Sequence, residues 1–75
     1  NIQMLDEILL AIINMEIQDT LEYRTSNGIL RINMYITDTQ EVEFKLYDLH
    51  MQEVEKITCY FDDEELEETL YYFVE

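Results

Sequence analysis

The chain has 75 residues, of which 18 are acidic and four are basic, so its formal net charge is -14. High net charge with few hydrophobic residues is typical of disordered chains, but 48% of these residues are hydrophobic, which favours one folded domain over residues 1–75. Free nucleic acid and anionic membranes would repel such a surface, whereas a basic protein would be attracted to it.

A single cysteine, Cys59, leaves no partner for an intramolecular disulfide, and this is typical of a protein in a reducing cytoplasm. No apolar run approaches the roughly 20 residues that span a bilayer, and no basic segment precedes an apolar run as in a signal peptide. We therefore expect a cytoplasmic protein with no membrane partner.

The first segment, residues 1–19, is predicted to form a helix of about four turns. Its inward stripe consists of Ile2, Leu5, Ile8, Leu9, Ile12 and Met15. Leu10 and Ile13 lie beside this stripe and make the apolar surface wider than packing on one sheet requires. Two interpretations stay open: a second helix covers these two residues, or they form a contact between subunits.

A β-hairpin is predicted next, with strands at residues 20–26 and 29–37. Asn27-Gly28 between two alternating runs favours a type I′ turn, since both residues tolerate a positive φ. In the second strand, Leu30, Ile32, Met34 and Ile36 face inward, and Arg31, Asn33 and Tyr35 face outward.

Two more strands are predicted at residues 41–47 and 53–61. The inward residues are Val42, Phe44 and Leu46 in the third strand and Ile57, Cys59 and Phe61 in the fourth; Glu41, Glu43, Lys45 and Tyr47 face outward. Val54 is out of phase with the inward set. Either a β-bulge near Glu55-Lys56 or a late strand start restores the phase.

The last segment is predicted to be a helix that begins at Asp62. Asp62 as N-cap and Glu65 three residues later resemble a capping box, and Leu66, Leu70 and Phe73 form the inward stripe. Of Tyr71 and Tyr72, we expect one to pack on the sheet and the other to be exposed. The predicted architecture is an α+β fold of order α-β-β-β-β-α, a four-stranded antiparallel meander with both helices on one face.

Acidic residues are concentrated in the second half of the chain. Residues 38–75 contain 13 of the 18 acids and two of the bases, and six acids lie between Asp62 and Glu68. Acids in a first helical turn are stabilised by the helix dipole, but Glu67 and Glu68 lie beyond that turn. An ordinary solvated surface intersperses both signs, so the excess calls for a second cause.

Strand and helix spacings suggest that cause. Side chains two apart on a strand share a face, and those three or four apart on a helix are neighbours, so both arrangements present carboxylates at intervals similar to those of DNA phosphates. The predicted partner-binding residues are Glu41, Glu43, Asp48, Glu53, Glu55, Asp63, Glu64, Glu67 and Glu68.

In size, charge and the acidic stretches "DDEELEE" and "EVEFKLYD", the chain resembles the small DNA-mimic proteins encoded mostly by phages and mobile elements. The resemblance implies an inhibitor in the bacterial cytoplasm that blocks the DNA-binding surface of a basic protein, such as a nucleoid protein, a nuclease, or a repair or restriction enzyme. It implies no direct binding of nucleic acid, and a homodimer would extend the charged face. The alternative is an acidic antitoxin or immunity-type protein that binds through a hydrophobic anchor.

Three tyrosines, Tyr35, Tyr47 and Tyr60, are predicted to point away from the helices. They could form a cluster on the sheet, either as cross-strand pairs or as an interface with a target or second subunit. We expect no enzymatic activity, no catalytic residues and no cofactor, because the sequence carries no catalytic motif. One glycine cannot build a phosphate-binding loop. No specific metal site is expected, since "DDEELEE" lacks the pattern of a calcium loop.

Overall fold

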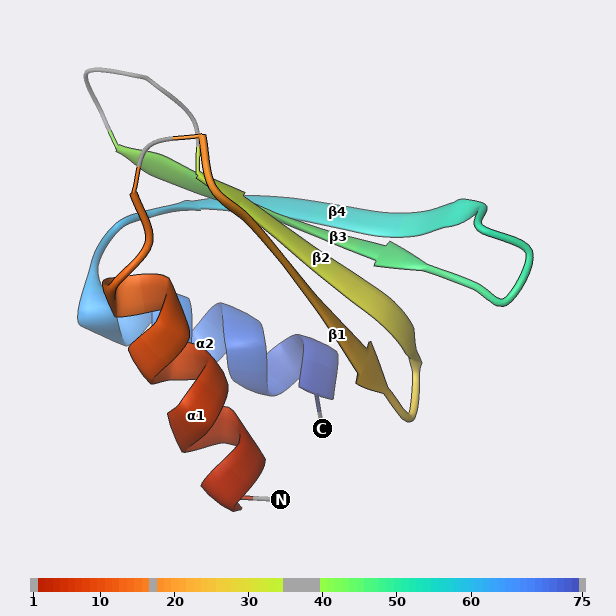
Figure 1. The fold of residues 1–75 in the computed structure, drawn as a ribbon, viewed down its shortest axis with the longest axis horizontal. Helices are drawn as coiled ribbons and strands as arrows, with labels where there is room; N and C mark the ends of the chain where they lie inside the picture. Colours follow the sequence, from red (N-terminus) through yellow and green to blue (C-terminus); the bar gives the residue numbers. More distant parts are fainter. Residues whose placement is uncertain (1, 17, 35–39, 75) are drawn as a thin grey trace.

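The computed structural model describes residues 2–16, 18–34 and 40–74 and shows one antiparallel sheet with two helices on the same face (Figure 1). The elements are α1 (Ile2–Ile13), β1 (Thr20–Thr25), β2 (Gly28–Met34), β3 (Glu41–Tyr47), β4 (Glu53–Tyr60) and α2 (Asp63–Val74). The strands lie in the order β1-β2-β3-β4. The predicted α+β meander is therefore confirmed.

Helix α1 is shorter than the sequence predicts, since it ends at Ile13. The side chain of Asn14 donates a hydrogen bond from Nδ2 to the carbonyl oxygen of Leu10 at 3.0 Å, a local bond that competes with further helical turns. Ile8 and Ile12 are buried as expected, but Leu10 and Ile13 are 61% and 41% exposed. The interpretation that a second helix covers these two residues is wrong, and a subunit contact stays a prediction.

The hairpin between β1 and β2 is confirmed, but its turn differs from the prediction. Thr25 pairs with Gly28, so Ser26 and Asn27 form the loop, and within this hairpin only Gly28 has a positive φ, of 137°. The predicted type I′ turn is therefore wrong. The Asn27 side chain instead donates from Nδ2 to the carbonyl oxygen of Phe73 at 3.0 Å, which ties the hairpin to the end of α2. Tyr35 and Ile36 lie outside the described residues.

The predicted bulge is present in β4 but lies at Val54. Leu46 pairs with Glu55 and Tyr47 pairs with Glu53, which leaves Val54 as the extra residue. Val54 is 60% exposed. Beyond the bulge the alternation is regular, so Ile57 and Cys59 face the helices and Lys56 pairs with Lys45 on the other face.

Helix α2 begins as predicted, with Asp62 as its N-cap. Asp62 Oδ1 accepts hydrogen bonds from the backbone N–H groups of Glu64 at 3.0 Å and Glu65 at 3.2 Å. The reciprocal half of a capping box is not formed, because the Asp62 N–H donates to the carbonyl oxygen of Tyr60 at 2.8 Å. Helices α1 and α2 have 12 residues each, and in the part of the chain that the structure describes no helix could cross a membrane.

The core lies between the sheet and the two helices. Phe44 of β3 stacks on Phe73 of α2 with ring centroids 5.9 Å apart. The buried apolar residues are Ile8, Ile12, Leu30, Ile32, Met34, Val42, Phe44, Cys59, Leu66, Leu70, Phe73 and Val74. Tyr71 and Tyr72 are 55% and 59% exposed, so the prediction that one of them packs on the sheet is wrong; Phe73 takes the inward position.

Candidate functional site

All four basic residues of the chain lie on the face of the sheet opposite the helices, which we call the outer face. Arg31, Lys45 and Lys56 are directly paired across β2, β3 and β4, and Arg24 lies on the same face of β1. Like charges in adjacent cross-strand positions repel. Acids between them relieve this repulsion: Arg31 pairs with Glu22 at 2.9 Å, and Lys45 with Glu53 at 3.7 Å.

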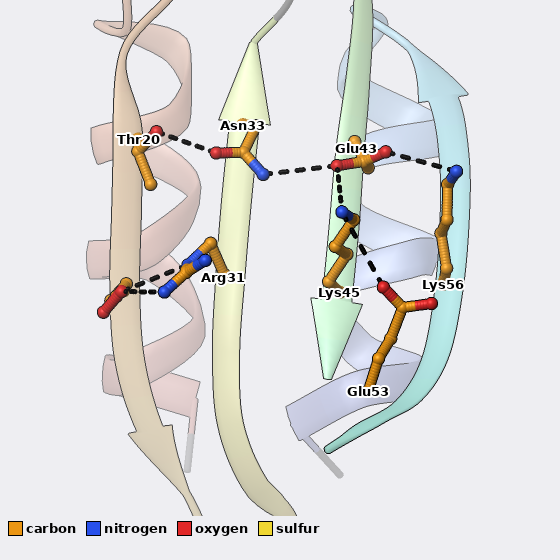
Figure 2. A network of polar contacts seen from close by, with 8 residues as sticks. Thr20, Arg31, Asn33, Glu43, Lys45, Glu53 and Lys56 are labelled. Atoms are coloured by element: carbon orange, nitrogen blue, oxygen red, sulfur yellow. Dashed lines mark hydrogen bonds and ion pairs between the residues drawn. The ribbon is translucent and has the colours of Figure 1, made fainter. Parts of the chain in front are cut away.

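Glu43 is at the centre of this network, and it is 4% exposed (Figure 2). Its two carboxylate oxygens lie 3.5 Å from Lys45 Nζ and 3.5 Å from Lys56 Nζ. Asn33 Nδ2 donates to the same carboxylate at 3.3 Å, while Thr20 donates to Asn33 Oδ1 at 2.7 Å and orients the amide. The prediction that Glu43 presents a carboxylate to a partner is therefore wrong, because neighbouring strands bury and neutralise it.

Two of the other predicted acids, Asp48 and Glu55, have contacts within the chain. Asp48 accepts hydrogen bonds from the backbone N–H groups of His50 and Gln52 at 2.8 and 3.0 Å and closes the β3–β4 turn. Glu55 lies on the helix side of β4 and accepts a hydrogen bond from the Tyr72 hydroxyl at 2.9 Å. Glu41 lies on the outer face. Glu41, Glu43 and Glu53 thus lie on the opposite face of the sheet from the acids of α2, and only Glu55 among the predicted strand acids lies on the helix side.

The four predicted partner-binding acids of helix α2 all stay exposed. Asp63, Glu64, Glu67 and Glu68 are all exposed, and α2 contains no basic residue. A groove of about 180 Å³ separates α1 from α2, with Leu5, Leu9 and Leu70 on its floor and Asp6, Glu67 and Tyr71 completing its walls. Residues Asp6, Asp63, Glu64, Glu67, Glu68 and Tyr71 form what we call the acidic helical surface.

Two members of this surface, Asp6 and Tyr71, were not among the residues predicted to bind a partner. The helical spacing of Leu5 and Leu9 places Asp6 beside the inward stripe of α1, but sequence spacing within one helix does not show which helix lies alongside. Tyr71 follows Glu64, Glu67 and Glu68 at intervals of seven, four and three residues, which puts it among them. These intervals are visible in the sequence, which therefore contains the signal that places Tyr71 among these acids.

The predicted tyrosine cluster is not formed by Tyr47 and Tyr60. These residues lie at opposite ends of the β3–β4 pair, about 20 Å apart at the usual rise of a strand. Tyr47 lies beneath the guanidinium of Arg31, 5.1 Å from the ring centroid. Tyr60 is 53% exposed and pairs with Glu41. Tyr35 lies outside the described residues.

The pKa values of Tyr72 and Cys59 are among those that the structure shifts. The hydrogen bond to Glu55, helped by the negative charge of that carboxylate, raises the pKa of the Tyr72 hydroxyl. Burial raises the pKa of the Cys59 thiol, and the charges of Glu65 and Asp62 act in the same direction against a hydrogen bond to Thr69. Both groups are therefore neutral near pH 7.

The described residues contain no group of three or more histidine, cysteine, aspartate or glutamate side chains arranged to hold a metal ion. No protein-family model matches the chain, and comparisons with curated proteins and with solved structures found no match.

Proposed function

We propose that this protein is a non-enzymatic inhibitor that imitates DNA, and that its acidic helical surface binds and blocks the DNA-binding surface of a basic protein. The observation that carries the proposal is the separation of charge in the fold. Every base lies on the outer face of the sheet, whereas the helices on the other face carry acids and no base. A sheet separates the two faces, so the positive charges do not neutralise the acidic helical surface.

The acids of α2 are also free of ion pairs within the described chain. The ion pairs that the structure describes involve Glu22, Glu43 and Glu53, all on strands. The carboxylates of α2 are therefore available to basic side chains of a partner protein. Their separations of three and four residues place the Cβ atoms of neighbouring acids roughly 5–6 Å apart. Lysine and arginine side chains that bind phosphates would donate hydrogen bonds to these carboxylates.

The class of target follows from this chemistry. A protein that binds duplex DNA does so chiefly through lysine and arginine contacts to phosphates, so a nucleoid protein, a nuclease, or a repair or restriction enzyme is the proposed partner. Such partners place the protein in the bacterial cytoplasm. The inhibitor acts by occupancy alone and needs no cofactor.

The proposal is tested by capture from a bacterial lysate on the immobilised protein at low salt, followed by elution with duplex DNA. We expect the DNA to elute a basic DNA-binding protein, because the duplex and the acidic helical surface compete for the same side chains. A second column carries the Glu64→Lys, Glu67→Lys, Glu68→Lys variant and should retain none of it. Equal retention on both columns would show that the binding surface lies elsewhere.

An antitoxin or immunity-type role is the second candidate, and one observation favours it. Tyr71 is 55% exposed beside the apolar floor of the α1–α2 groove, where it could anchor a partner with the acids at the rim. The two functions differ in their salt response. Affinity that depends on many ion pairs falls steeply as salt rises, whereas an anchored interface is less sensitive. Duplex DNA would not displace an antitoxin's partner.

A further inference from the structure

Among the described residues, strand β1 forms one edge of the sheet and has no partner strand on its free side (Figure 1). Its six residues pair with β2 in a regular register, with no bulge, and the chain contains no proline. None of the six is fully buried. Natural edge strands are protected by proline, bulges or covering elements, because an unpaired row of N–H and C=O groups is a template for another strand. In the part of the chain that the structure describes, the β1 edge has no proline, no bulge and no further strand beside it, and its charged side chains, Glu22 and Arg24, are of opposite sign.

We propose that β1 pairs antiparallel with β1 of a second copy of this chain, about a two-fold axis at Tyr23. In this register Glu22 of each copy lies directly opposite Arg24 of the other. Both residues lie on the outer face, as shown by their pairing with Arg31 and Ile29. A two-fold interface repeats each contact, so the pairing forms two Glu22–Arg24 contacts between opposite charges.

The charged atoms required for these contacts are available. Arg31 donates from Nε and from one terminal nitrogen to the same oxygen of Glu22, Oε1, at 3.1 and 2.9 Å. The second oxygen, Oε2, makes no hydrogen bond or ion pair with a described residue. Arg24 is exposed and has no ion pair within the described chain. One Glu22 carboxylate can thus accept from its own Arg31 and from Arg24 of the second copy.

The charges select this register over its neighbours. A two-fold axis moved to Glu22 would place two glutamates opposite each other, and an axis at Arg24 would place two arginines opposite each other. Like charges in directly opposed positions destabilise a strand pair. Of these three axes, only the one at Tyr23 places opposite charges across from each other twice. The charges of β1 therefore favour this register of the two strands.

Net charge also favours this edge. Two chains of charge -14 repel each other, but β1 carries one acid and one base. The other edge strand, β4, contains two acids, Glu53 and Glu55, and one base, Lys56, and the Val54 bulge interrupts its regular pairing. Because opposed residues share a face, the paired sheets would be continuous, and the helices of both copies would lie on the same side. The pairing does not depend on the proposed function.

Sedimentation equilibrium of the full chain at low salt tests the pairing. We expect a dimer whose dissociation constant rises about tenfold in Arg24→Gln. The matched control is Gln52→Glu, in the exposed β3–β4 turn, which changes the net charge by the same amount and should leave the constant unchanged. Circular dichroism checks that both variants fold. A monomeric wild type, or an equal effect of the two variants, would overturn the proposal.

A crosslink tests the register. Glu22→Cys chains mixed with Arg24→Cys chains should form a disulfide-linked heterodimer on oxidation, because opposed Cα atoms lie about 4.5–5.5 Å apart, within the range of a disulfide. The other Glu22–Arg24 contact stays intact in this mixture. Each variant alone should not crosslink, since the new thiol faces an arginine or a glutamate. Crosslinking within the single variants, or none in the mixture, would contradict the axis at Tyr23.

Discussion

Lys56 Nζ lies 3.5 Å from Oε2 of Glu43, on a sheet face that neither helix covers (Figure 2). Lys45 approaches the other oxygen of the same carboxylate at 3.5 Å. A carboxylate that is 4% exposed would be costly without such partners. The arrangement involves one acid and two of the four bases of the chain, and their contacts stabilise the sheet. It also holds the positive charges of Lys45 and Lys56 on the outer face, away from the helices.

Replacement of Glu43 by alanine should destabilise the fold. The change leaves Asn33 and two lysines without the carboxylate, and loss of hydrogen bonds to a charged group costs about 1–3 kcal/mol. Glu53→Ala is the control, since Glu53 is exposed and pairs with Lys45 at 3.7 Å; it should cost less than about 1 kcal/mol. Urea unfolding measures the free energy of unfolding of both variants. Equal losses would mean that the burial of Glu43 contributes nothing to stability.

Replacement of Gly28 by alanine should also destabilise the fold, through the backbone. Gly28 has a φ of 137°, and a Cβ there would overlap the carbonyl oxygen of Tyr47. Strain of this kind costs about 1–3 kcal/mol. Ser26→Ala in the same turn should have little effect, because Ser26 is exposed. Thermal unfolding distinguishes the two variants; a Gly28→Ala chain as stable as the wild type would show that β3 moves away freely.

The Cys59 thiol should titrate above its ordinary pKa of 9.0 in the folded chain, chiefly because it is buried. A raised folded pKa means that the stabilising contribution of the neutral thiol is complete below pH 9.0 and is lost as the pH rises through the folded pKa. The rate of alkylation by iodoacetamide against pH measures this. The midpoint should lie above that of the urea-unfolded chain, and Glu65→Gln should lower it. Coincident midpoints for folded and unfolded chains would contradict the burial of Cys59.

Much of the fold was predictable because single elements have strong local patterns. Alternation placed Val42 and Phe44 in the core, and helical spacing placed Leu66 and Leu70 there. The errors arose where distant contacts decide the local structure. The side chain of Asn27 bonds to the end of α2, which no pattern within the hairpin reveals.

The candidate site was predictable only in part, for the same reason. The acids of α2 are exposed because the inward stripe of that helix fixes which side faces solvent. Glu43 has the same alternating pattern as an exposed strand acid, and its burial depends on which lysines the register of β3 and β4 brings beside it. The groove lined by Asp6 of α1 and Glu67 of α2 depends on how the two helices pack. The periodicity of residues within one helix does not contain that information.

Displacement of a labelled DNA duplex from the purified basic partner tests the central claim most directly. The wild-type chain should release the duplex, and the Glu64→Lys, Glu67→Lys, Glu68→Lys variant should need at least about tenfold more protein to do so. Glu16→Lys, on an exposed residue before β1, should act like the wild type. If the triple variant displaces the duplex as well as the wild type does, the acidic helical surface is not where the partner binds.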